Sequence, residues 1–313
     1  RKVKGLQYII TISLKKNGEE ISMADLLSGL EQFGLGNLKN MNLYDEPVKK
    51  TDENGGKAAT AAAAPVMQEQ DYLFDKAYSC PICDKEFKAR TVRVGKVKLA
   101  GTDLDLRPKY DQVDLLKYDI IMCPHCGYAA LSRFFKFVTS LQSKNIKATI
   151  SASFKPQTEV KETYSYEDAL ERYKLTLANA IVKQAKPSEK AYICLKTAWL
   201  LRGKGEHMDT AAADYAEQKK KLDDEENEYL HNALEGFLAA RQTENFPMCG
   251  MDEPTVDYLI AVLSMRFEQY DVATRLVSGI LTNPSANPRM KDKARMVKEM
   301  LVKKIKEKNA AKK

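Results

Sequence analysis

Cys80-Pro-Ile-Cys83 and Cys123-Pro-His-Cys126 are the two stretches that decide the fold of this sequence. Each is a C-P-x-C knuckle, in which the proline restricts the backbone and a tight turn lets two sulfurs converge on one ion. Four cysteine thiolates are the ligand set that closes a tetrahedral structural zinc site. The spacing therefore predicts that Cys80, Cys83, Cys123 and Cys126 together bind one Zn²⁺ ion.

The role of that metal follows from the number of cysteine ligands. A catalytic zinc typically has three protein ligands and an open position for water, whereas four thiolates close the shell. His125 lies inside the second knuckle, where an imidazole could replace one cysteine. We expect His125 instead to project outward beside the turn. The sequence thus predicts a structural zinc site without catalytic residues.

The residues between the knuckles favour short strands. Residues 91–94, 96–99 and 118–122 contain the alternating apolar and β-branched residues that are typical of strands, and the last of these runs directly into the second knuckle. We therefore predict a small β-rich zinc ribbon over residues 71–138, in which two knuckles are joined through a small sheet.

A loop between the knuckles is unusually rich in carboxylates. It reads Asp103-Leu-Asp105-Leu-Arg107-Pro108-Lys-Tyr110. One interpretation is a second cation site or a general acid/base pair, which would make the protein an enzyme. The other is a loop capped by its own aspartates and by a local Asp–Arg107 ion pair. We favour the second, because the segment lacks calcium-loop spacing and has no neighbouring His or Ser nucleophile. Convergence of the carboxylates beside a second cation site would favour the enzyme.

A basic stretch follows the first knuckle. Its positively charged residues fall within fourteen positions, several on the polar side of a predicted strand: Lys85, Lys88, Arg90, Arg93, Lys96 and Lys98. A basic strand face on a zinc ribbon can bind nucleic acid through phosphate contacts. Few aromatic residues are interleaved with the charges, so stacking on single strands has weak support, and a solvated strand face is the simpler interpretation.

The first 70 residues divide into three short segments. The codons of residues 17–20 can encode a purine-rich ribosome-binding site just upstream of Met23, so we expect translation to start there and residues 1–22 to be a translated leader. Residues 23–45 form a short amphipathic segment. Residues 46–70, with Gly-Gly and an alanine tract, indicate a flexible linker.

Two interpretations of the amphipathic segment remain open. Its apolar residues fall on one helical face before glycines end the helix: Leu26, Leu27, Leu30 and Phe33. The segment can fold back onto the main body, or it can act as a docking peptide that enters a groove on another protein.

The second half of the chain has helical periodicity. After a polar connection at residues 139–163, apolar stripes predict helices over 166–173, 188–202, 210–241, 255–281 and 287–308. Phe267, Tyr270 and Ala273, followed by Pro284, match the aromatic, small and proline positions of a tetratricopeptide repeat. We predict an all-α tetratricopeptide-like domain over residues 164–308, with a basic tail at 309–313. Such helix arrays form concave surfaces that bind peptides.

Charge, motifs and cysteine spacing limit the classes of function that the sequence supports. The net charge of +7 is concentrated in residues 1–22 and 289–313, which leaves a mildly acidic body, so the basic pI alone does not indicate nucleic-acid binding. No phosphate loop, nucleophile elbow, metalloprotease or dinucleotide motif is present. The one apolar run near the start, residues 6–14, is too short to span a bilayer. Paired rather than disulfide-forming cysteines indicate a reducing, cytoplasmic location.

Taken in order, the knuckles, the Asp103–Tyr110 loop and the Tyr118-Asp119-x-x-x-Cys123-Pro-His-Cys126-Gly-Tyr segment resemble an uncharacterised bacterial family, domain of unknown function 2225. The resemblance covers roughly residues 70–300. It implies a cytoplasmic zinc ribbon fused to tetratricopeptide-like helices, and it implies no catalytic residues.

The sequence therefore predicts a non-enzymatic, zinc-stabilised scaffold or protein-binding protein that contacts a protein or peptide through its helical domain. The alternative is a nucleic-acid-associated regulator that uses the basic strand face. Affinity that falls steeply with salt would identify the alternative, because phosphate contacts release counterions. The oligomeric state and the pathway are not predicted.

Overall fold

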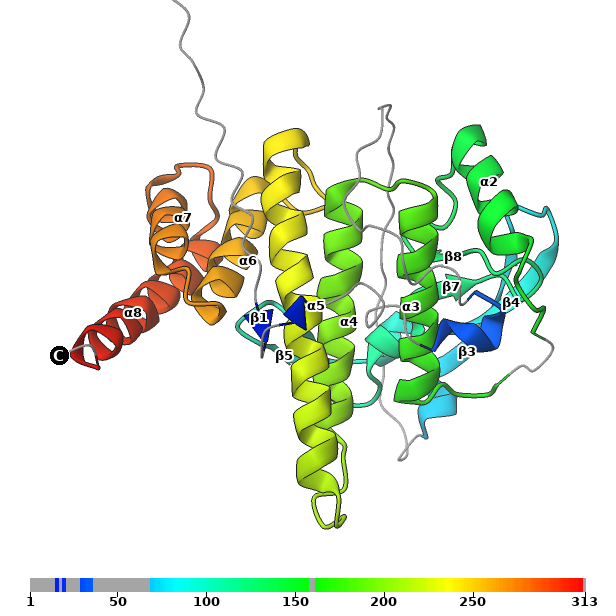
Figure 1. Cartoon of the computed structure of the whole chain (residues 1–313), viewed down its shortest axis with the longest axis horizontal. Helices are drawn as coiled ribbons and strands as arrows, with labels where there is room; N and C mark the ends of the chain where they lie inside the picture. The colour runs from blue at the N-terminus through cyan, green and yellow to red at the C-terminus, as the bar shows by residue number, and fades with distance from the viewer. Residues whose placement is uncertain (1–14, 17–18, 21–28, 36–67, 158–160, 312–313) are drawn as a thin grey trace, which may run out of the picture.

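The computed structural model describes residues 15–16, 19–20, 29–35, 68–157 and 161–311. Short β-strands and a short helix lie at one end of the molecule, the C-terminal helices lie at the other, and longer helices stand side by side between them (Figure 1). The predicted leader at residues 1–22 and the predicted linker at 46–70 fall almost entirely outside the described residues.

Three antiparallel hairpins form the ribbon. β3 (Leu73–Ser79) pairs with β4 (Glu86–Val92), β5 (Leu99–Thr102) with β6 (Pro108–Tyr110), and β7 (Ile120–Met122) with β8 (Ala129–Leu131). Two residue pairs also join β1 (Lys15–Lys16) to β2 (Glu19–Glu20). The first knuckle connects β3 to β4 and the second connects β7 to β8. The ribbon therefore consists of separate two-stranded units and not of one continuous sheet.

The observed strands differ from the predicted ones at their ends. β4 stops at Val92, and Val94–Lys96 forms a 3-10 turn, because Gly95 interrupts the strand-like pattern. A second 3-10 turn, Leu115–Tyr118, is capped by the Asp114 carboxylate, which accepts the Leu116 amide at 3.0 Å. The predicted strand at 118–122 is therefore shortened to β7.

The remainder of the described chain is helical. Its helices are α2 (Ser140–Ile146), continued by a π-helical turn at Lys147–Ser151, then α3 (Tyr166–Val182), α4 (Pro187–Glu206), α5 (Tyr215–Thr243), α6 (Glu253–Arg266), α7 (Tyr270–Thr282) and α8 (Pro288–Ala310). Side chains of Ser165, Asp252 and Asn287 cap the starts of α3, α6 and α8. The predicted all-α region is confirmed, and the segment predicted as a polar connection contains α2.

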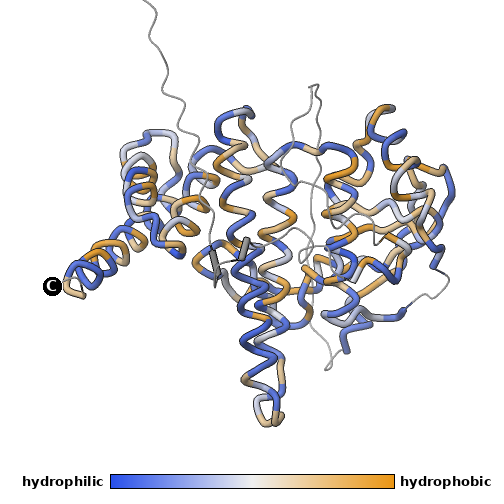
Figure 2. Tube along the Cα trace, in the orientation of Figure 1, coloured by the Kyte–Doolittle hydropathy of each residue, from blue (hydrophilic) through white to orange (hydrophobic). Residues whose placement is uncertain are grey.

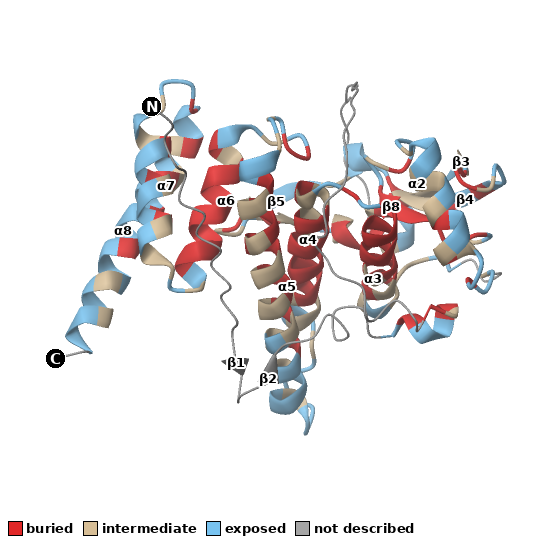
Figure 3. Cartoon of the chain, turned by 45° about the horizontal axis from the view of Figure 1, so that its top comes forward, coloured by how far each residue is buried: buried red, intermediate tan, exposed pale blue. Residues whose placement is uncertain are grey.

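One hydrophobic core crosses from the ribbon into the helices. It joins ribbon residues such as Ile82 and Tyr128 to residues of α3 through α6. A second cluster lies between α6, α7 and α8. Figure 3 shows the buried residues concentrated in α3, α4 and α6, while Figure 2 shows hydrophilic residues along the projecting end of the α4–α5 hairpin. Burial of shared apolar surface thus holds the ribbon against the helices.

The described part of the amphipathic segment folds back onto the body. Leu30–Phe33 form a 3-10 turn, and Leu30 and Phe33 are buried. The Phe33 ring stacks on Phe154 with centroids 5.9 Å apart, and the Lys155 amide donates to the Phe33 carbonyl at 3.1 Å. Gly34 has a φ of 78°, and a Cβ there would lie 2.3 Å from the Ser153 carbonyl oxygen, so only glycine fits.

The tetratricopeptide assignment stays a prediction. Phe267 ends α6 and Tyr270 begins α7, so the matched residues lie at a tight turn between two helices, as that repeat requires.

Within the part of the chain that the structure describes, no helix is long and apolar enough to cross a membrane.

Candidate metal centre

The two knuckles have the same backbone geometry. In the first, the Asp84 amide donates to the Cys80 carbonyl at 2.9 Å; in the second, the Gly127 amide donates to the Cys123 carbonyl at 3.1 Å. The residue after each second cysteine has a left-handed backbone, with φ of 59° at Asp84 and 73° at Gly127. Asp and Gly are among the residues that tolerate this conformation. The turn directs both sulfurs of a knuckle to the same side.

The four sulfurs converge on one point. The Cys80 and Cys126 sulfurs are 3.6 Å apart, the Cys83 and Cys123 sulfurs are 3.7 Å apart, and all four lie within 4.8 Å of one another. Tetrahedral bonds of about 2.3 Å to a central zinc would separate the sulfurs by about 3.8 Å. The cysteines therefore fit a tetrahedral metal ion, as the sequence predicted for these residues.

The electrostatics of the centre also favour a cation. Hydrogen bonding to Cys123 and burial raise the pKa of the Cys80 thiol, and the same sulfur contact raises the pKa of Cys126. The same hydrogen bonds lower the pKa of the Cys123 thiol, so the shared protons of the buried sulfurs oppose ionisation of Cys80 and Cys126. A divalent cation removes this penalty, since it attracts every thiolate that binds it.

The second knuckle is fixed against the helices. Gly127 has no room for a side chain, because a Cβ there would lie 2.4 Å from the Phe154 ring. The Asn179 side-chain amide on α3 donates to the Gly127 carbonyl at 3.0 Å. Arg172, also on α3, donates to the Ile120 carbonyl at 3.1 Å. These buried contacts position the metal centre relative to α3.

The remaining polar residue of the knuckles lies outside the cluster. His125 is exposed, whereas Cys80, Cys123 and Cys126 are buried and Cys83 is half-buried. Four sulfurs complete a tetrahedral shell and leave no position for a substrate or an activated water. The arrangement is therefore suited to stabilising the fold.

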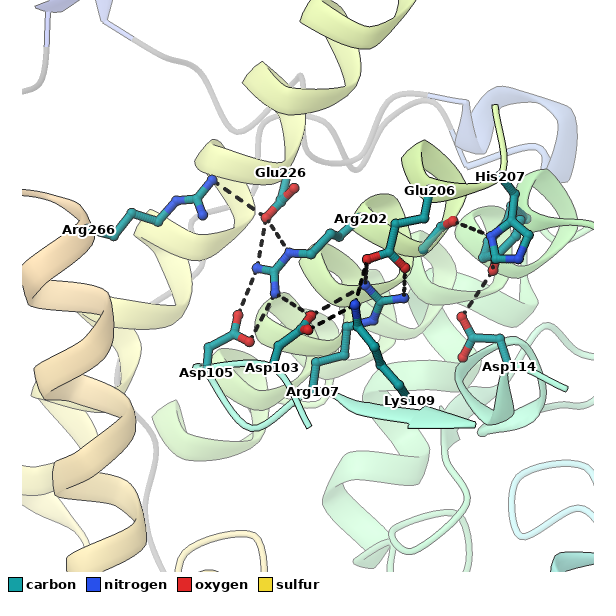
Figure 4. Close-up of polar contacts among 12 residues, drawn as sticks. Asp103, Asp105, Arg107, Lys109, Asp114, Arg202, Glu206, His207, Glu226 and Arg266 are labelled. Atoms are coloured by element: carbon teal, nitrogen blue, oxygen red, sulfur yellow. Dashed lines mark hydrogen bonds and ion pairs between the residues drawn. The ribbon is translucent and has the colours of Figure 1, made fainter. Parts of the chain in front are cut away.

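The carboxylate-rich loop forms a second polar centre, shown in Figure 4. It connects β5 to β6 and contacts α4 and α5 through a set of charged residues that we call the charged cluster: Asp103, Asp105, Arg107, Lys109, Arg202, Glu206 and Glu226. Arg202 of α4 makes a two-pronged contact with Asp105 at 3.0 and 2.8 Å and also donates to Glu226 of α5 at 2.8 Å. The cluster therefore attaches the β5–β6 hairpin to two helices.

The other half of the cluster is built in the same way. Arg107 contacts both oxygens of Glu206 at 3.1 and 2.8 Å, and Lys109 lies between Glu206 and Asp103 at 3.0 and 3.1 Å. Burial opposes ionisation of Asp103, but hydrogen bonds from Lys109 and Arg202 outweigh it and lower the pKa of Asp103. The expected Asp103–Arg107 pair is present at 3.5 Å.

The cluster does not gather its carboxylates around a second cation. Apart from the four cysteines, no group of three or more His, Cys, Asp or Glu side chains within the described ranges has the spacing of a metal site. Arg202 occupies the position between Asp105 and Glu226 that a cation would need. These contacts support the interpretation of the loop as a structural element.

A glycine in the last turn of α4 makes the close approach possible. A Cβ at Gly203 would lie 2.9 Å from an Asp114 oxygen and 3.0 Å from Arg107. Burial raises the pKa of Asp114, although its carboxylate accepts the Leu116 amide and the Tyr166 hydroxyl. The helical partners of the loop were not predicted from the sequence. An Arg-Gly pair after an apolar helical run was the available signal, since neither residue suits a buried helix face without a partner.

The basic stretch is partly occupied by internal contacts. Arg90 pairs with Asp75 at 3.2 Å, and Arg93 donates to the Leu73 carbonyl at 3.2 Å and lies over the Phe74 ring. The lysines of the stretch, Lys85, Lys88, Lys96 and Lys98, are exposed. Four of the six basic residues predicted for nucleic-acid binding are thus exposed on the ribbon surface.

Comparison with known proteins gives one match. No curated protein and no solved structure matches this chain. A family model described as an uncharacterised protein conserved in bacteria matches residues 73–301, a range that contains both knuckles, the charged cluster and most of the helical region. The chain therefore belongs to the bacterial family DUF2225.

Proposed function

We propose that this chain is a non-enzymatic, zinc-stabilised scaffold of the bacterial cytoplasm that binds a protein partner through its helical region. The cysteine geometry supports zinc, because a buried tetrahedral set of four sulfurs is the usual structural zinc site. None of the six cysteines forms a disulfide, which is consistent with a reducing compartment.

The observation that carries the binding proposal is the outer surface of α8. This helix buries Ala294, Val297 and Leu301 against α6 and α7, yet Met296 and Met300 are 59% and 38% exposed. Exposed methionines adapt to varied apolar partners, and Val302 on the same helix is also 45% exposed.

A groove beside α8 indicates what kind of partner fits. It has a volume of about 670 Å³ and is lined by Leu281 of α7 and by Arg295, Lys298, Glu299 and Val302 of α8. Its apolar walls and mainly basic rim complement an amphipathic helix with acidic residues on its polar face. α8 itself carries nine Lys/Arg against three acids, which strengthens the attraction.

Affinity capture with paired variants tests the proposal. The full chain is used as bait at low and high salt, together with the double variant Met300→Glu/Val302→Glu, which changes one exposed methionine and one residue that lines the groove. A matched control, Val94→Glu/Leu99→Glu, makes the same change at two exposed apolar residues of the ribbon. We expect wild type and the control to retain a protein partner at high salt, and the α8 variant to lose it. The purified partner should bind the three chains with the same pattern.

Two outcomes would contradict the proposal. Equal loss of the partner from both double variants would show that α8 is not the contact surface. Nucleic acid recovered at low salt and lost at high salt, with no protein partner, would favour the regulator that uses Lys85, Lys88, Lys96 and Lys98. Metal analysis in parallel should give about one zinc per chain, since four thiolates bind one ion.

A further inference from the structure

A small cavity on the ribbon is lined by none of the four clustered cysteines and by no residue of α8. It has a volume of about 290 Å³ and is lined by Lys76 and Tyr78 of β3, Ile121 of β7 and the turn that follows β8. That turn contributes Arg133, Lys136 and Phe137. The volume is at the lower end of the range for ligand pockets.

Hydrogen bonds give the turn a fixed shape. The Ser132 amide donates to the Asp119 carbonyl at 2.8 Å, and the Phe137 amide donates to the Phe134 carbonyl at 3.0 Å. The buried Tyr128 hydroxyl donates to the Phe135 carbonyl at 3.0 Å. The cavity wall is therefore anchored to the strand that carries the second knuckle, and it is in place before any ligand arrives.

The cations around the cavity have no carboxylate partner among the described residues, although Lys76 lies over the Tyr78 ring and Arg133 donates to the Cys249 carbonyl. Lys76, Arg133 and Lys136 line it, and no Asp or Glu of the described chain does so. None of these three cations forms an ion pair with a carboxylate in the part of the chain that the structure describes. The adjacent carboxylate of Asp119 is already bound by Ser132 and Lys196, at 2.6 and 2.5 Å. The cavity therefore has an excess of positive charge, as does the ribbon surface that carries Lys85, Lys88, Lys96 and Lys98.

Aromatic residues supply the other half of the surface. Phe137 is 56% exposed at the cavity, an unusual position for a phenylalanine in an ordered turn. Tyr78 is half-buried and held by Phe87 and Phe135, with ring centroids 5.9 and 5.8 Å away. A free aromatic face beside cations that lack a carboxylate partner can stack a planar base while the cations contact a phosphate.

We propose that this cavity binds a nucleotide, with the phosphate between Lys76, Arg133 and Lys136 and the base stacked on Phe137. A free nucleotide and one unit of a single-stranded nucleic acid share this chemistry. The site is separate from the helical surface of the proposed function, so either proposal can fail without the other.

Binding of two probes to the full, metal-loaded chain tests the site. Adenosine monophosphate is measured by calorimetry, and a labelled single-stranded oligonucleotide is measured by fluorescence anisotropy over a range of salt concentrations. The variant Lys76→Gln/Lys136→Gln removes two charges from the cavity. The control Lys85→Gln/Lys88→Gln removes two exposed charges from the same ribbon outside it. Arg133 is left unchanged, because it also donates to the Cys249 carbonyl.

We expect the cavity variant, and not the control, to weaken binding. For the oligonucleotide, the slope of log affinity against log salt should fall by about 1.4 in magnitude, since each phosphate contact on a single strand contributes about 0.7. Phe137→Ala should weaken binding about tenfold, and Phe137→Trp should restore it, because base stacking on an aromatic ring contributes at this level.

The pattern of results separates the ligand sources and can overturn the proposal. Binding of both probes with similar affinity supports a free nucleotide, and much tighter binding of the oligonucleotide supports a single strand. The proposal is overturned if neither probe binds at low salt, if an acidic peptide binds where the nucleotides do not, or if the control variant loses as much affinity as the cavity variant. If Phe137→Ala bound both probes as tightly as wild type, base stacking on Phe137 would be ruled out.

Discussion

The metal centre and the charged cluster hold the ribbon by different chemistry. At the metal centre, the four sulfurs lie within 4.8 Å of one another and all come from the ribbon. In the charged cluster, the carboxylates of the β5–β6 hairpin contact Arg202 of α4 and, through it, Glu226 of α5. The first centre fixes the ribbon internally, and the second fixes it to the helices. Their removal should therefore have different consequences, which the following variants measure.

Removal of the metal should have the largest effect. A structural zinc site contributes on the order of 10 kcal/mol to folding, which is comparable with the whole stability of a typical domain. We expect Cys123→Ser, or a strong chelator, to unfold the ribbon. Because ribbon residues share a core with α3 to α6, thermal denaturation should also show destabilised helices.

A second cysteine gives the control for this prediction. Cys194 is fully buried in α4 and distant in sequence from both knuckles, and burial raises the pKa of its thiol. Cys194→Ala should keep the full metal content and lose only the small free energy of a shortened core side chain. If Cys123→Ser kept a wild-type unfolding curve, the metal centre would not be what holds the ribbon together.

Disruption of the charged cluster should have the next largest effect. Arg202→Ala leaves Asp105 and Glu226 without their main partner, and both carboxylates are less than a tenth exposed. Breaking a buried ion pair from one side costs about 3–5 kcal/mol. We expect this loss of unfolding free energy in denaturant titrations, with the zinc content unchanged, because the cysteine ligands are not touched.

Arg266 offers a matched control within the same network. It reaches Glu226 at 3.6 Å, but its side chain is 41% exposed. Exposed ion pairs contribute about 0–1 kcal/mol, so Arg266→Ala should change stability little. Similar losses in the two variants would mean that burial of the cluster does not determine its contribution, and loss of metal in Arg202→Ala would mean that the two centres are not independent.

The docked segment at residues 29–35 provides a third attachment to compare with these two. Phe33 is 5% exposed and stacks on Phe154. We expect Phe33→Ala to cost about 3 kcal/mol, the lower end for a buried phenylalanine, because the short segment can undock without unfolding the body. Hydrogen exchange at the Lys155 amide should become faster, since that amide donates to the Phe33 carbonyl. The exposed Gln32→Ala variant should show neither change.

The contrast between the two centres also explains what could be predicted from the sequence. The convergence of the four cysteines was predictable because each pair recurs within a four-residue motif whose chemistry is specific to cysteine. The helices were predictable from apolar periodicity, and α3 to α8 all form where the pattern indicated. Arg202 was not predicted to meet Asp105, because the two residues are 97 positions apart and a single charged residue on a helix is usually solvated. The placement of Phe33 had two physically reasonable solutions, and only packing against Phe154 chooses between them.

Lowering the pH should give the smallest difference in stability. It affects the contributions of two carboxylates in opposite directions. Burial disfavours ionised Glu206, but hydrogen bonds from Arg107 and Lys109 outweigh this and lower its pKa below the usual 4.5. Its contribution to stability is therefore present above about pH 4.5 and is lost as the pH falls through the lowered pKa. Asp114 has the opposite sign, because burial raises its pKa above 3.8 and its contribution is lost as the pH rises through that raised value.

We therefore expect Glu206→Gln to lose less stability than wild type between pH 6 and pH 3, and Asp114→Asn to lose more. The Glu206 side chain is 38% exposed, so the difference for that variant should stay below about 1 kcal/mol. Denaturant titrations at each pH measure it, restricted to conditions in which both proteins keep their metal, since protonation of the cysteine ligands would dominate otherwise. If the free energy of unfolding of Glu206→Gln followed that of wild type down to pH 3, the exposed Glu206 contacts would contribute nothing to stability. The contribution of the charged cluster would then come from the Arg202 contacts alone.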